Sequence, residues 1–290
     1  MKLVIIGAGN VATHLALALH SLKASQKNNF PFSFPCGESP EGERGKGGLE
    51  GVGIEICQIF SRTEENARAL AERVNAGYTT QVSQIVRDAD VYLYAVADSA
   101  LPDLASQINA PDALHIHTSG STAMDVFADV AENYGVLYPL QTFSKHKTVR
   151  FAEIPVFVEG SNEFAKNKIV EIAQLLTEKL HFMDSDGRKK LHLSAVFVCN
   201  FVNHLYAVGA ELVQDAGVNF DVLQPLIQET AEKIKTLSPR DAQTGPAVRK
   251  DKNIIQKQLK LLENKRELAK IYELITKDIY ETLLKTHSRS

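Results

Sequence analysis

Three small residues at fixed spacing, Gly7, Gly9 and Ala12, follow directly after an apolar run from Leu3 to Ile6. The run predicts a buried strand, and the residues after the motif have the apolar spacing of a helix. In that context Gly7 permits a tight turn, Gly9 lets a pyrophosphate approach the backbone, and Ala12 keeps helix and strand close. With the N–H groups of the helix start holding the anion, the predicted cofactor contacts are Gly7, Ala8, Gly9, Asn10, Val11 and Ala12. The alternative is a strand–turn–helix whose small residues serve packing alone.

The second predicted strand, 54–60, ends in Ser61, Arg62 and Thr63, and no carboxylate stands at its tip. In NAD-binding proteins an acid at this place binds the adenosine ribose. A guanidinium flanked by two hydroxyls instead suits a 2′-phosphate, which it can bind through paired charge-assisted hydrogen bonds. The sequence therefore predicts NADP as the cofactor, held in part by Ser61, Arg62 and Thr63. Alternatively, Ser61 and Glu64 form a capping box for the next helix and Arg62 is solvated.

Two further loops follow predicted strands and should line the same crevice, because such sheets bind ligands at the carboxyl ends of their strands. The small residues after strand 91–95 leave room for the nicotinamide half, and the residues after 114–117 offer N–H groups and hydroxyls. The predicted contacts in these loops are Ala95, Val96, Ala97, Thr118, Ser119 and Gly120. Ser119 is also a candidate catalytic residue, although a helix cap or turn would use it equally. His115 and His117 alternate on one strand, where packing is favoured over metal binding because no cysteine or acid stands near them.

Hydride transfer is the work of a nicotinamide ring, so the protein must supply a proton donor or acceptor. A long apolar helix predicted over 190–217 begins with Lys190 and His192 and carries Asn200 further along. His192 and Asn200 lie about two turns apart and within roughly 80° on the helix, which is compatible with one cleft. The imidazole of His192 suits general acid chemistry. The predicted catalytic residues on this helix are His192, Asn200 and Lys190. Each has a structural alternative: a surface histidine, an asparagine that satisfies backbone groups, or a solvated lysine.

Strand and helix patterns alternate over the first 185 residues, which predicts an α/β fold with a doubly wound parallel sheet. The expected strands are 2–6, 54–60, 91–95, 114–117, 136–138, 155–158 and 181–183. Segment 24–53 is rich in Gly and Pro and has no periodicity, so we expect a flexible insertion there, or else a lid or partner loop. After residue 185 helices are expected over 190–217, 223–237, 254–262 and 268–284. The predicted organisation is a Rossmann-like domain over 1–185 and an all-α domain over 186–290.

Composition narrows the class of partners. With a net charge of −3, 44% hydrophobic and 23% charged residues, the chain has the composition of an ordinary soluble globular protein. The scattered basic residues argue against nucleic-acid binding, and no apolar stretch is expected to reach the roughly 20 residues of a membrane span. No signal peptide is expected, because the first residues already form a strand. The three cysteines, Cys36, Cys57 and Cys199, lack metal-ligand spacing and are expected to be reduced in a cytoplasmic protein.

Five segments carry a family resemblance. They are Gly7-Ala-Gly-Asn-Val-Ala12, His115-x-His117-Thr-Ser-Gly-Ser121, Tyr138-Pro-Leu-Gln-Thr-Phe143, Asn200 in the apolar helix, and Thr244-Gly-Pro-x-x-Arg249-x-Asp251. The chain resembles a family of predicted NADP oxidoreductases with a Rossmann-like N-terminal domain and a helical C-terminal domain of unknown function. That family is grouped with pyrroline-5-carboxylate reductase, 6-phosphogluconate dehydrogenase and deazaflavin-dependent NADP oxidoreductases. The resemblance implies a helical domain that commonly dimerises and a site between the domains. From the residues alone, Gly245 and Pro246 separate two helices, and Arg249 either pairs locally with Asp251 or holds an anion of the substrate.

Together these features predict an NADP(H)-dependent oxidoreductase that transfers a hydride to or from a small imine, keto or hydroxy substrate in the cleft between domains. A homodimer through the helical domain is expected, with no nucleic-acid or membrane partner. The alternative is an NADP-binding protein without turnover, a redox sensor or regulatory protein, which needs no proton donor beside the hydride acceptor. A third interpretation replaces the organic substrate with a deazaflavin, which needs a wide flat pocket beside the nicotinamide.

Overall fold

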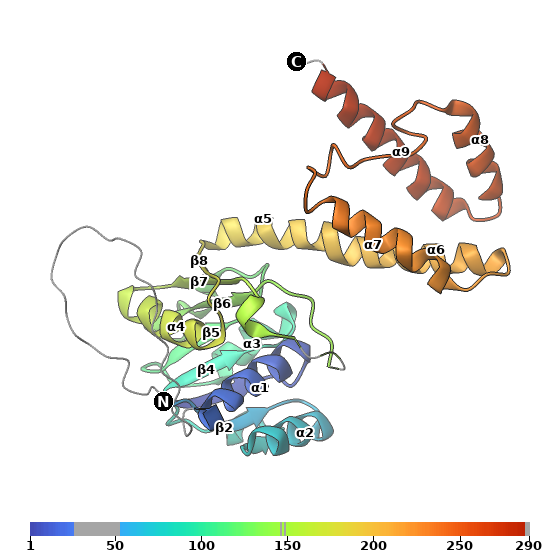
Figure 1. The fold of residues 1–290 in the computed structure, drawn as a ribbon. Helices are drawn as coiled ribbons and strands as arrows, with labels where there is room; N and C mark the ends of the chain where they lie inside the picture. The colour runs from blue at the N-terminus through green and yellow to red at the C-terminus, as the bar shows by residue number, and fades with distance from the viewer. Residues whose placement is uncertain (26–52, 146, 148, 288–290) are drawn as a thin grey trace. The chain divides into compact units, whose positions relative to one another are not determined.

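The computed structural model describes residues 1–25, 53–145, 147 and 149–287 (Figure 1). The chain divides into two compact units, Met1–His204 and Leu205–Ser290. The domain boundary predicted between residues 185 and 186 stays a prediction. The insertion expected over 24–53 lies almost wholly outside the described residues, and so does Cys36.

Eight strands within the described residues form one sheet in the first unit, in the order β3-β2-β1-β4-β5-β6-β7-β8. They are β1 (Lys2–Ile6), β2 (Glu55–Phe60), β3 (Gly77–Thr79), β4 (Val91–Tyr94), β5 (Leu114–His117), β6 (Asn133–Pro139), β7 (Val156–Gly160) and β8 (Leu180–Phe182). The order reverses at β1, because β2 and β3 lie on one side of it and β4 and β5 on the other. A doubly wound sheet opens its ligand crevice at such a reversal, beyond the carboxyl ends of the strands. The Rossmann-like α/β fold is therefore confirmed.

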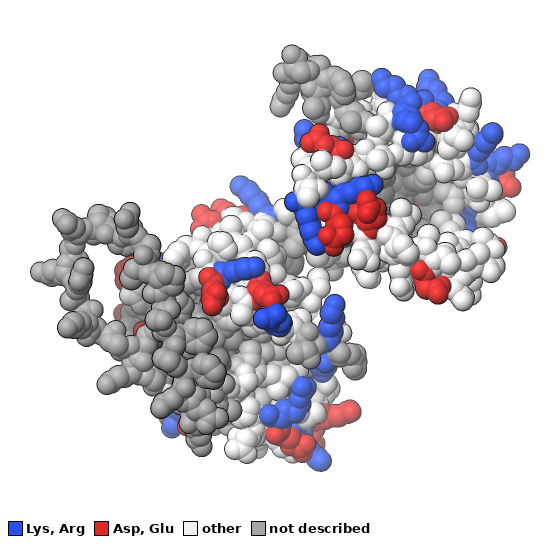
Figure 2. All heavy atoms as spheres, viewed as in Figure 1, with Lys and Arg blue, Asp and Glu red and all other residues white. Residues whose placement is uncertain are grey.

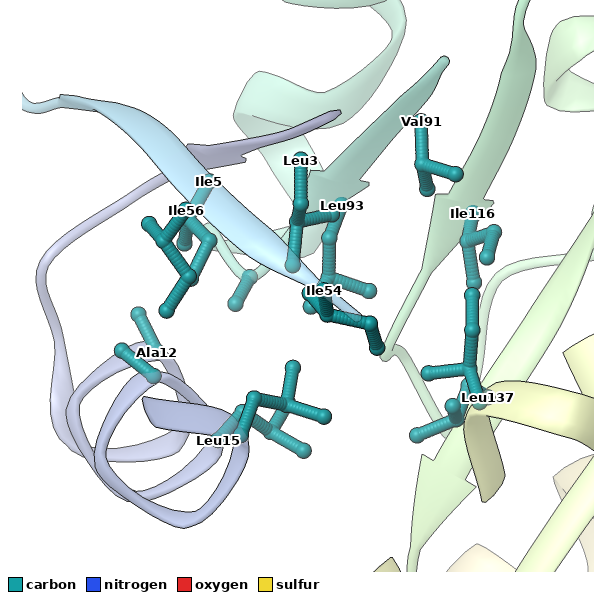
Figure 3. Packing of buried hydrophobic residues seen from close by; sticks show 14 of the residues in the cluster. Leu3, Ile5, Ala12, Leu15, Ile54, Ile56, Val91, Leu93, Ile116 and Leu137 are labelled. Atoms are coloured by element: carbon teal, nitrogen blue, oxygen red, sulfur yellow. The ribbon is translucent and has the colours of Figure 1, made fainter. Parts of the chain in front are cut away.

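Helices pack on both faces of this sheet (Figure 1): α1 (Asn10–Ser25), α2 (Glu64–Val74), α3 (Leu101–Gln107) and α4 (Glu163–Leu176). Because successive side chains of a strand point to opposite faces, Leu3 and Ile5 of β1 join one core and Val4 and Ile6 join another. Figure 3 shows the first core, in which Ala12 of α1 packs against the sheet. These two cores hold β1 and α1, and with them the glycine-rich turn, in a fixed relation.

Two features of the sheet differ from the sequence prediction. β6 and β7 pair antiparallel, whereas the other pairs of this sheet are parallel. In the described part of the connection between them, the regular element is a short 3-10 turn, Phe151–Glu153, while parallel pairing needs a longer crossover, usually a helix. β3 was not predicted, because its residues Gly-Tyr-Thr contain no apolar run.

One continuous helical stretch runs from Ser185 to Asp215 and consists of α5 (Ser185–Ala195), a π-helical segment (Val196–Phe201) and α6 (Val202–Asp215). It begins earlier than its apolar pattern predicts, because the Asp184 carboxylate accepts a hydrogen bond from Gly187 N at 2.7 Å and caps the helix. An 18-residue window within it is apolar enough to cross a membrane, and none of that window is buried. The expectation that no apolar stretch reaches membrane-spanning length is therefore wrong, because this helix has the length and composition of a span. Core helices of soluble proteins meet the same two criteria.

The second unit contains the rest of α6 together with α7 (Gln224–Lys233), α8 (Lys252–Leu261) and α9 (Arg266–His287). These helices correspond to those predicted over 223–237, 254–262 and 268–284. The Asp251 carboxylate accepts a hydrogen bond from Ile254 N at 3.1 Å and caps α8. Asp251 therefore acts as a helix cap rather than as the predicted ion-pair partner of Arg249.

Acidic and basic side chains are interspersed on the face of the molecule seen in Figure 2. Several pair along helices, as Lys166 does with Glu163 at 3.3 Å and Lys168 with Glu171 at 2.8 Å. Among the described residues on that face, positive and negative charges are mixed, so neither sign dominates the electrostatic potential there. This agrees with the small net charge of −3.

Candidate functional site

The turn after β1 is shaped by Gly7, whose φ of +123° lies where side chains are strained. A Cβ at this position would lie 2.3 Å from the carbonyl oxygen of Ala95, so glycine lets β1 end this close to the chain that follows β4. Gly7 N donates to Phe60 O at 2.7 Å and ties the turn to β2. At Gly9 a Cβ would meet no described atom within 4 Å, which leaves open space for a ligand to approach the backbone.

A cavity of about 500 Å³ opens beside this turn, at the carboxyl ends of the strands, and a volume of this order is typical of cofactor sites. Its lining comes wholly from the first unit and consists of Gly7, Ala8, Gly9, Asn10, Val11, Phe60, Ser61, Arg62, Ala95, Val96, Ala97, Asp98, Ala100, Leu104, Thr118, Ser119, Gly120, Tyr138, Pro139, Gln141 and His192. Of the predicted cofactor contacts, Ala12 and Thr63 do not line it, because Ala12 is buried against the sheet and Thr63 precedes α2 as its N-cap. A larger hollow of about 640 Å³ lies at the amino ends of the strands, where open α/β sheets do not bind their ligands.

Arg62 is exposed and belongs to the cavity wall at the end of β2. Helix α2 begins at Glu64 with Thr63 as its N-cap. The alternative of a capping box between Ser61 and Glu64 is therefore wrong, because Ser61 lies two residues before the N-cap. Ser61 N donates instead to Thr79 O at 3.2 Å. Ser61 and Arg62 thus remain in the wall of the cavity, and their contact with a 2′-phosphate stays a prediction.

The Ser119 hydroxyl builds the loop that follows β5. It accepts hydrogen bonds from Ser121 N at 3.1 Å and Thr122 N at 2.9 Å, and it lies 3.1 Å from Thr122 Oγ1, to which it donates. Ser119 N donates to His117 Nδ1 at 3.1 Å. Ser119 therefore lines the cavity and also forms a turn, which was the alternative to a catalytic role. Its N–H is already used in the hydrogen bond to His117.

Both histidines of β5 are fully buried. His115 Nδ1 lies 2.9 Å from the Tyr94 hydroxyl, and its Nε2 lies 2.9 Å from Ala110 O. Burial lowers the pKa of His115, and burial together with the positive charge of Arg188 lowers the pKa of His117 to about 4. Both rings are neutral at pH 7 and pack in the core, as the packing interpretation predicts. No group of three or more His, Cys, Asp or Glu side chains suited to a metal occurs in the described part of the chain.

Arg188 of α5 is a buried charge that the sequence did not single out, with 1% of its surface exposed. Its guanidinium pairs with Glu159 of β7 and donates to Ser119 O at 3.1 Å and Thr122 O at 2.5 Å. The N–H and hydroxyl of Ser185 donate to the same Glu159 carboxylate at 2.9 Å and 2.8 Å. This network fastens the first turn of α5 to β7 and to the cavity loop. In the sequence nothing distinguishes Arg188 from the two lysines that follow it.

The attachment of α5 places His192, one turn beyond Arg188, in the cavity wall. His192 Nδ1 lies 3.0 Å from the hydroxyl oxygen of Tyr138, near the end of β6. The imidazole also covers Gly120, where a Cβ would lie 2.6 Å from Nδ1, so the absent side chain makes room for the ring. Burial raises the pKa of Tyr138, and the positive charge of Arg188 works against that rise.

The structure brings Ser119 and His192, but not Lys190 or Asn200, to the cavity within the first unit. Lys190 and Asn200 are exposed on the long helix, and their catalytic roles stay predictions. Tyr138 lines the cavity although it was not among the predicted site residues. Its position at the carboxyl end of the predicted strand 136–138 could have revealed it, by the same rule that pointed to 95–97 and 118–120.

A glycine turn at the reversal of a doubly wound sheet, with a cavity beside it, defines a dinucleotide-binding protein of the Rossmann class. Residues 42–120 match a family described as NADP oxidoreductase, coenzyme F420-dependent, and residues 154–279 match a domain of unknown function. A solved structure from Bacteroides fragilis, described as an NADP oxidoreductase, is 40% identical, covers 97% of this chain and 98% of its own, and has a TM-score of 0.83. The chain therefore belongs to this family of NADP oxidoreductases, and its cofactor is NADP.

Two more distant structures share the fold. A pyrroline carboxylate reductase from Plasmodium falciparum with NADP bound is 12% identical, covers 97% of each chain and has a TM-score of 0.53. An imine reductase from Myxococcus stipitatus in complex with NADP⁺ is 14% identical, covers 100% of this chain and 95% of its own, and has a TM-score of 0.54. A search of curated proteins found no significant match.

Proposed function

We propose that the protein transfers a hydride between NADP(H) and a small imine, keto or hydroxy compound, and that His192 exchanges the accompanying proton. The observation that carries the proposal is that His192 lies in the wall of the same cavity as the turn from Gly7 to Val11. NADP supplies the hydride chemistry when it is bound, and the chain supplies binding, orientation and the proton. An imidazole suits this task because it can give and take a proton near neutral pH.

The lining of the cavity supports a small polar substrate. Thr118 and Gln141 contribute a hydroxyl and an amide group to the same wall as His192. Two structures that share the fold are named as enzymes acting on carbon–nitrogen double bonds, the imine reductase and the pyrroline carboxylate reductase. Imines therefore stand first among the substrates to test, ahead of keto acids and semialdehydes.

The test is oxidation of NADPH by the purified protein against a panel of imines, keto acids, semialdehydes and a deazaflavin, which the F420-dependent family description calls for. We expect turnover with at least one acceptor. In His192→Asn, kcat should fall by about 100-fold or more, while the affinity for NADPH in calorimetry stays unchanged. The matched control is His181→Asn, which changes an exposed histidine of β8. Tight NADPH binding without turnover on the whole panel would favour the sensor interpretation. Equal activity of the two variants would exclude His192 as the proton donor.

We also propose that Arg62 selects NADP by binding its 2′-phosphate, because Arg62 is the exposed cation in the cavity wall at the end of β2. Replacing Arg62 with Gln removes a charge-assisted contact worth about 2 kcal/mol, so NADPH affinity should fall about 30-fold while NADH affinity stays the same. Arg68→Gln is the matched control, since Arg68 is an exposed arginine of α2 that pairs with Glu72 and does not line the cavity. If Arg62→Gln kept the wild-type preference for NADPH over NADH, Arg62 would not be the residue that binds the 2′-phosphate.

We propose further that the long helix packs against a second copy of the chain. Phe197, Val198 and Phe201 are between 50% and 68% exposed, and monomeric soluble proteins rarely expose large contiguous apolar patches. A homodimer is favoured over a membrane because Asn200 and Asn203 interrupt this surface, and because most oligomers of soluble proteins are symmetric assemblies of one chain. Light scattering should show a dimer for the wild type and a smaller mass for Phe201→Glu. A monomeric wild type, or uptake by lipid vesicles, would contradict the proposal.

A further inference from the structure

Tyr138 and His192 form a hydrogen-bonded pair in the cavity wall, with 3.0 Å between the hydroxyl oxygen and Nδ1. Either group could donate, so the direction must come from the surroundings of the hydroxyl. Tyr138 has 8% of its surface exposed, and Nδ1 is the partner that the structure shows for its hydroxyl among the described residues. If Nδ1 donated to the hydroxyl oxygen, the hydroxyl hydrogen would have no partner among the described residues and would need one from the contents of the cavity. The arrangement that satisfies both groups has Tyr138 donating to Nδ1.

This direction of donation fixes the tautomer of the neutral imidazole. With Nδ1 acting as an acceptor, the ring proton of His192 lies on Nε2. Nε2 is then the ring nitrogen left to act on a bound substrate in the cavity that His192 lines. A neutral imidazole alone is a poor acid because loss of its proton would leave an anionic ring, so a second proton must arrive at Nδ1 as Nε2 gives up its own.

The charged and titratable groups around the pair favour Tyr138 as the source of that second proton. Burial is the largest influence on the pKa of Tyr138 and raises it, the Arg188 charge of α5 acts against that rise, and Cys199 of the π-helical segment adds to it. Glu159 of β7 is paired with the Arg188 guanidinium and keeps it in place. The buried Arg188 charge therefore offsets part of the cost that burial places on a transient negative charge at the Tyr138 oxygen.

We propose that Tyr138 and His192 form a proton relay, an inference that rests on the proposed oxidoreductase function. As a hydride from NADPH reaches the carbon of the substrate's C=N or C=O bond, its nitrogen or oxygen takes the proton from His192 Nε2. The Tyr138 proton moves to Nδ1 as Nε2 loses its own. Water then protonates Nε2, and the Nδ1 proton returns to the phenolate, which restores the starting state of both groups. The substrate gains two electrons, and NADPH is oxidised to NADP⁺. Tyr138 acts through His192 and is a positioning residue rather than a group that touches the substrate.

The first test needs neither cofactor nor turnover. With ¹⁵N-labelled histidine, the neutral ring of His192 should show a protonated Nε2 and an unprotonated Nδ1 whose resonance is displaced by the hydrogen bond. In Tyr138→Phe the Nδ1 resonance should move to the position of an unbonded nitrogen. Tyr134→Phe removes the hydroxyl of a partly buried tyrosine on the same strand, outside the cavity, and should leave His192 unchanged. A protonated Nδ1 in the wild type, or an unmoved resonance in Tyr138→Phe, would overturn the relay.

The second test is the pH profile of kcat with an acceptor that the wild type reduces. Without Tyr138 only the cationic imidazole can donate, so the alkaline limb should move to lower pH by about one unit or more, and kcat at pH ~8 should fall about 10-fold or more. Tyr134→Phe should retain the wild-type profile. A wild type that turns over no acceptor removes the proposed function and the relay with it. Turnover with an unchanged alkaline limb in Tyr138→Phe removes the relay alone.

Discussion

Acid should destabilise the sheet through one buried histidine, His117. Its ring is fully buried, accepts a hydrogen bond from Ser119 N at 3.1 Å through Nδ1, and lies 3.3 Å from Ala123 O through Nε2. A second ring proton would point at the Ser119 N–H, and the new charge would lie near Arg188. Burial is the largest cause that lowers the pKa of His117 to about 4, and the Arg188 charge is the next.

The size of the effect follows from linkage. The unfolded chain binds a proton at this histidine with a pKa of ~6.5, whereas the folded chain does so at about 4. Between these values the unfolded state holds more protons, so stability falls as the pH is lowered through that window and is unaffected above it. The full difference amounts to about 3 kcal/mol, of which about 2 kcal/mol is already lost at pH 5.

The assay is urea unfolding followed by circular dichroism at pH 7 and pH 5, for the wild type and for His117→Asn. Asparagine keeps an acceptor for Ser119 N and does not titrate, while His115 and all carboxylates remain in both proteins. The wild type should lose about 2 kcal/mol more than the variant between the two pH values. Losses that agree to within about 0.5 kcal/mol would refute the reasoning from burial and charge.

Three further substitutions test other parts of the structure. Gly7→Ala forces a Cβ against Ala95 O and should cost about 2 kcal/mol or more in urea unfolding and abolish NADPH binding in calorimetry. Arg188→Met leaves the Glu159 carboxylate without its cation and should cost about 3–5 kcal/mol, with part of the loss recovered when Glu159→Gln is added; no recovery in the double variant would contradict the pairing. Asp251→Ala removes the cap of α8 and should lower local stability by about 1 kcal/mol, measured by hydrogen exchange of the first amides of that helix.

The strands of the sheet were predictable where an apolar run coincides with a strand that helices cover on both faces. The bounds of β1 and β4 fall within one residue of the predicted ranges for this reason. Pairing direction was not predictable in the same way, since the antiparallel β6 and β7 depend on how the chain returns between them. The start of the long helix was missed because Asp184 caps it ahead of its first apolar residues.

Most of the cavity lining was predictable because ligands bind beyond the carboxyl ends of parallel strands, a rule that converts strand ends into neighbours in space. The polar pairs of the site obey no such rule. Tyr138 and His192 are 54 positions apart, and Arg188 and Glu159 are 29 apart. Each pair depends on the docking of α5 against β6 and β7, which is a consequence of packing that no local pattern records.

One buried cation links the stability of the site to its chemistry. The Arg188 charge lowers the pKa of His117, which keeps that ring neutral in the core, and it works in the same direction on Tyr138, which makes a phenolate there easier to form. Arg188→Lys separates these roles, because a lysine keeps the charge but cannot reproduce the forked donation to Ser119 O, Thr122 O and the carboxylate of Glu159. If the charge serves the relay, Arg188→Lys should be destabilised yet retain the alkaline limb of the wild type, whereas Arg188→Met should lose both. The same loss of kcat at high pH in the two variants would mean that the fork, and not the charge, supports Tyr138.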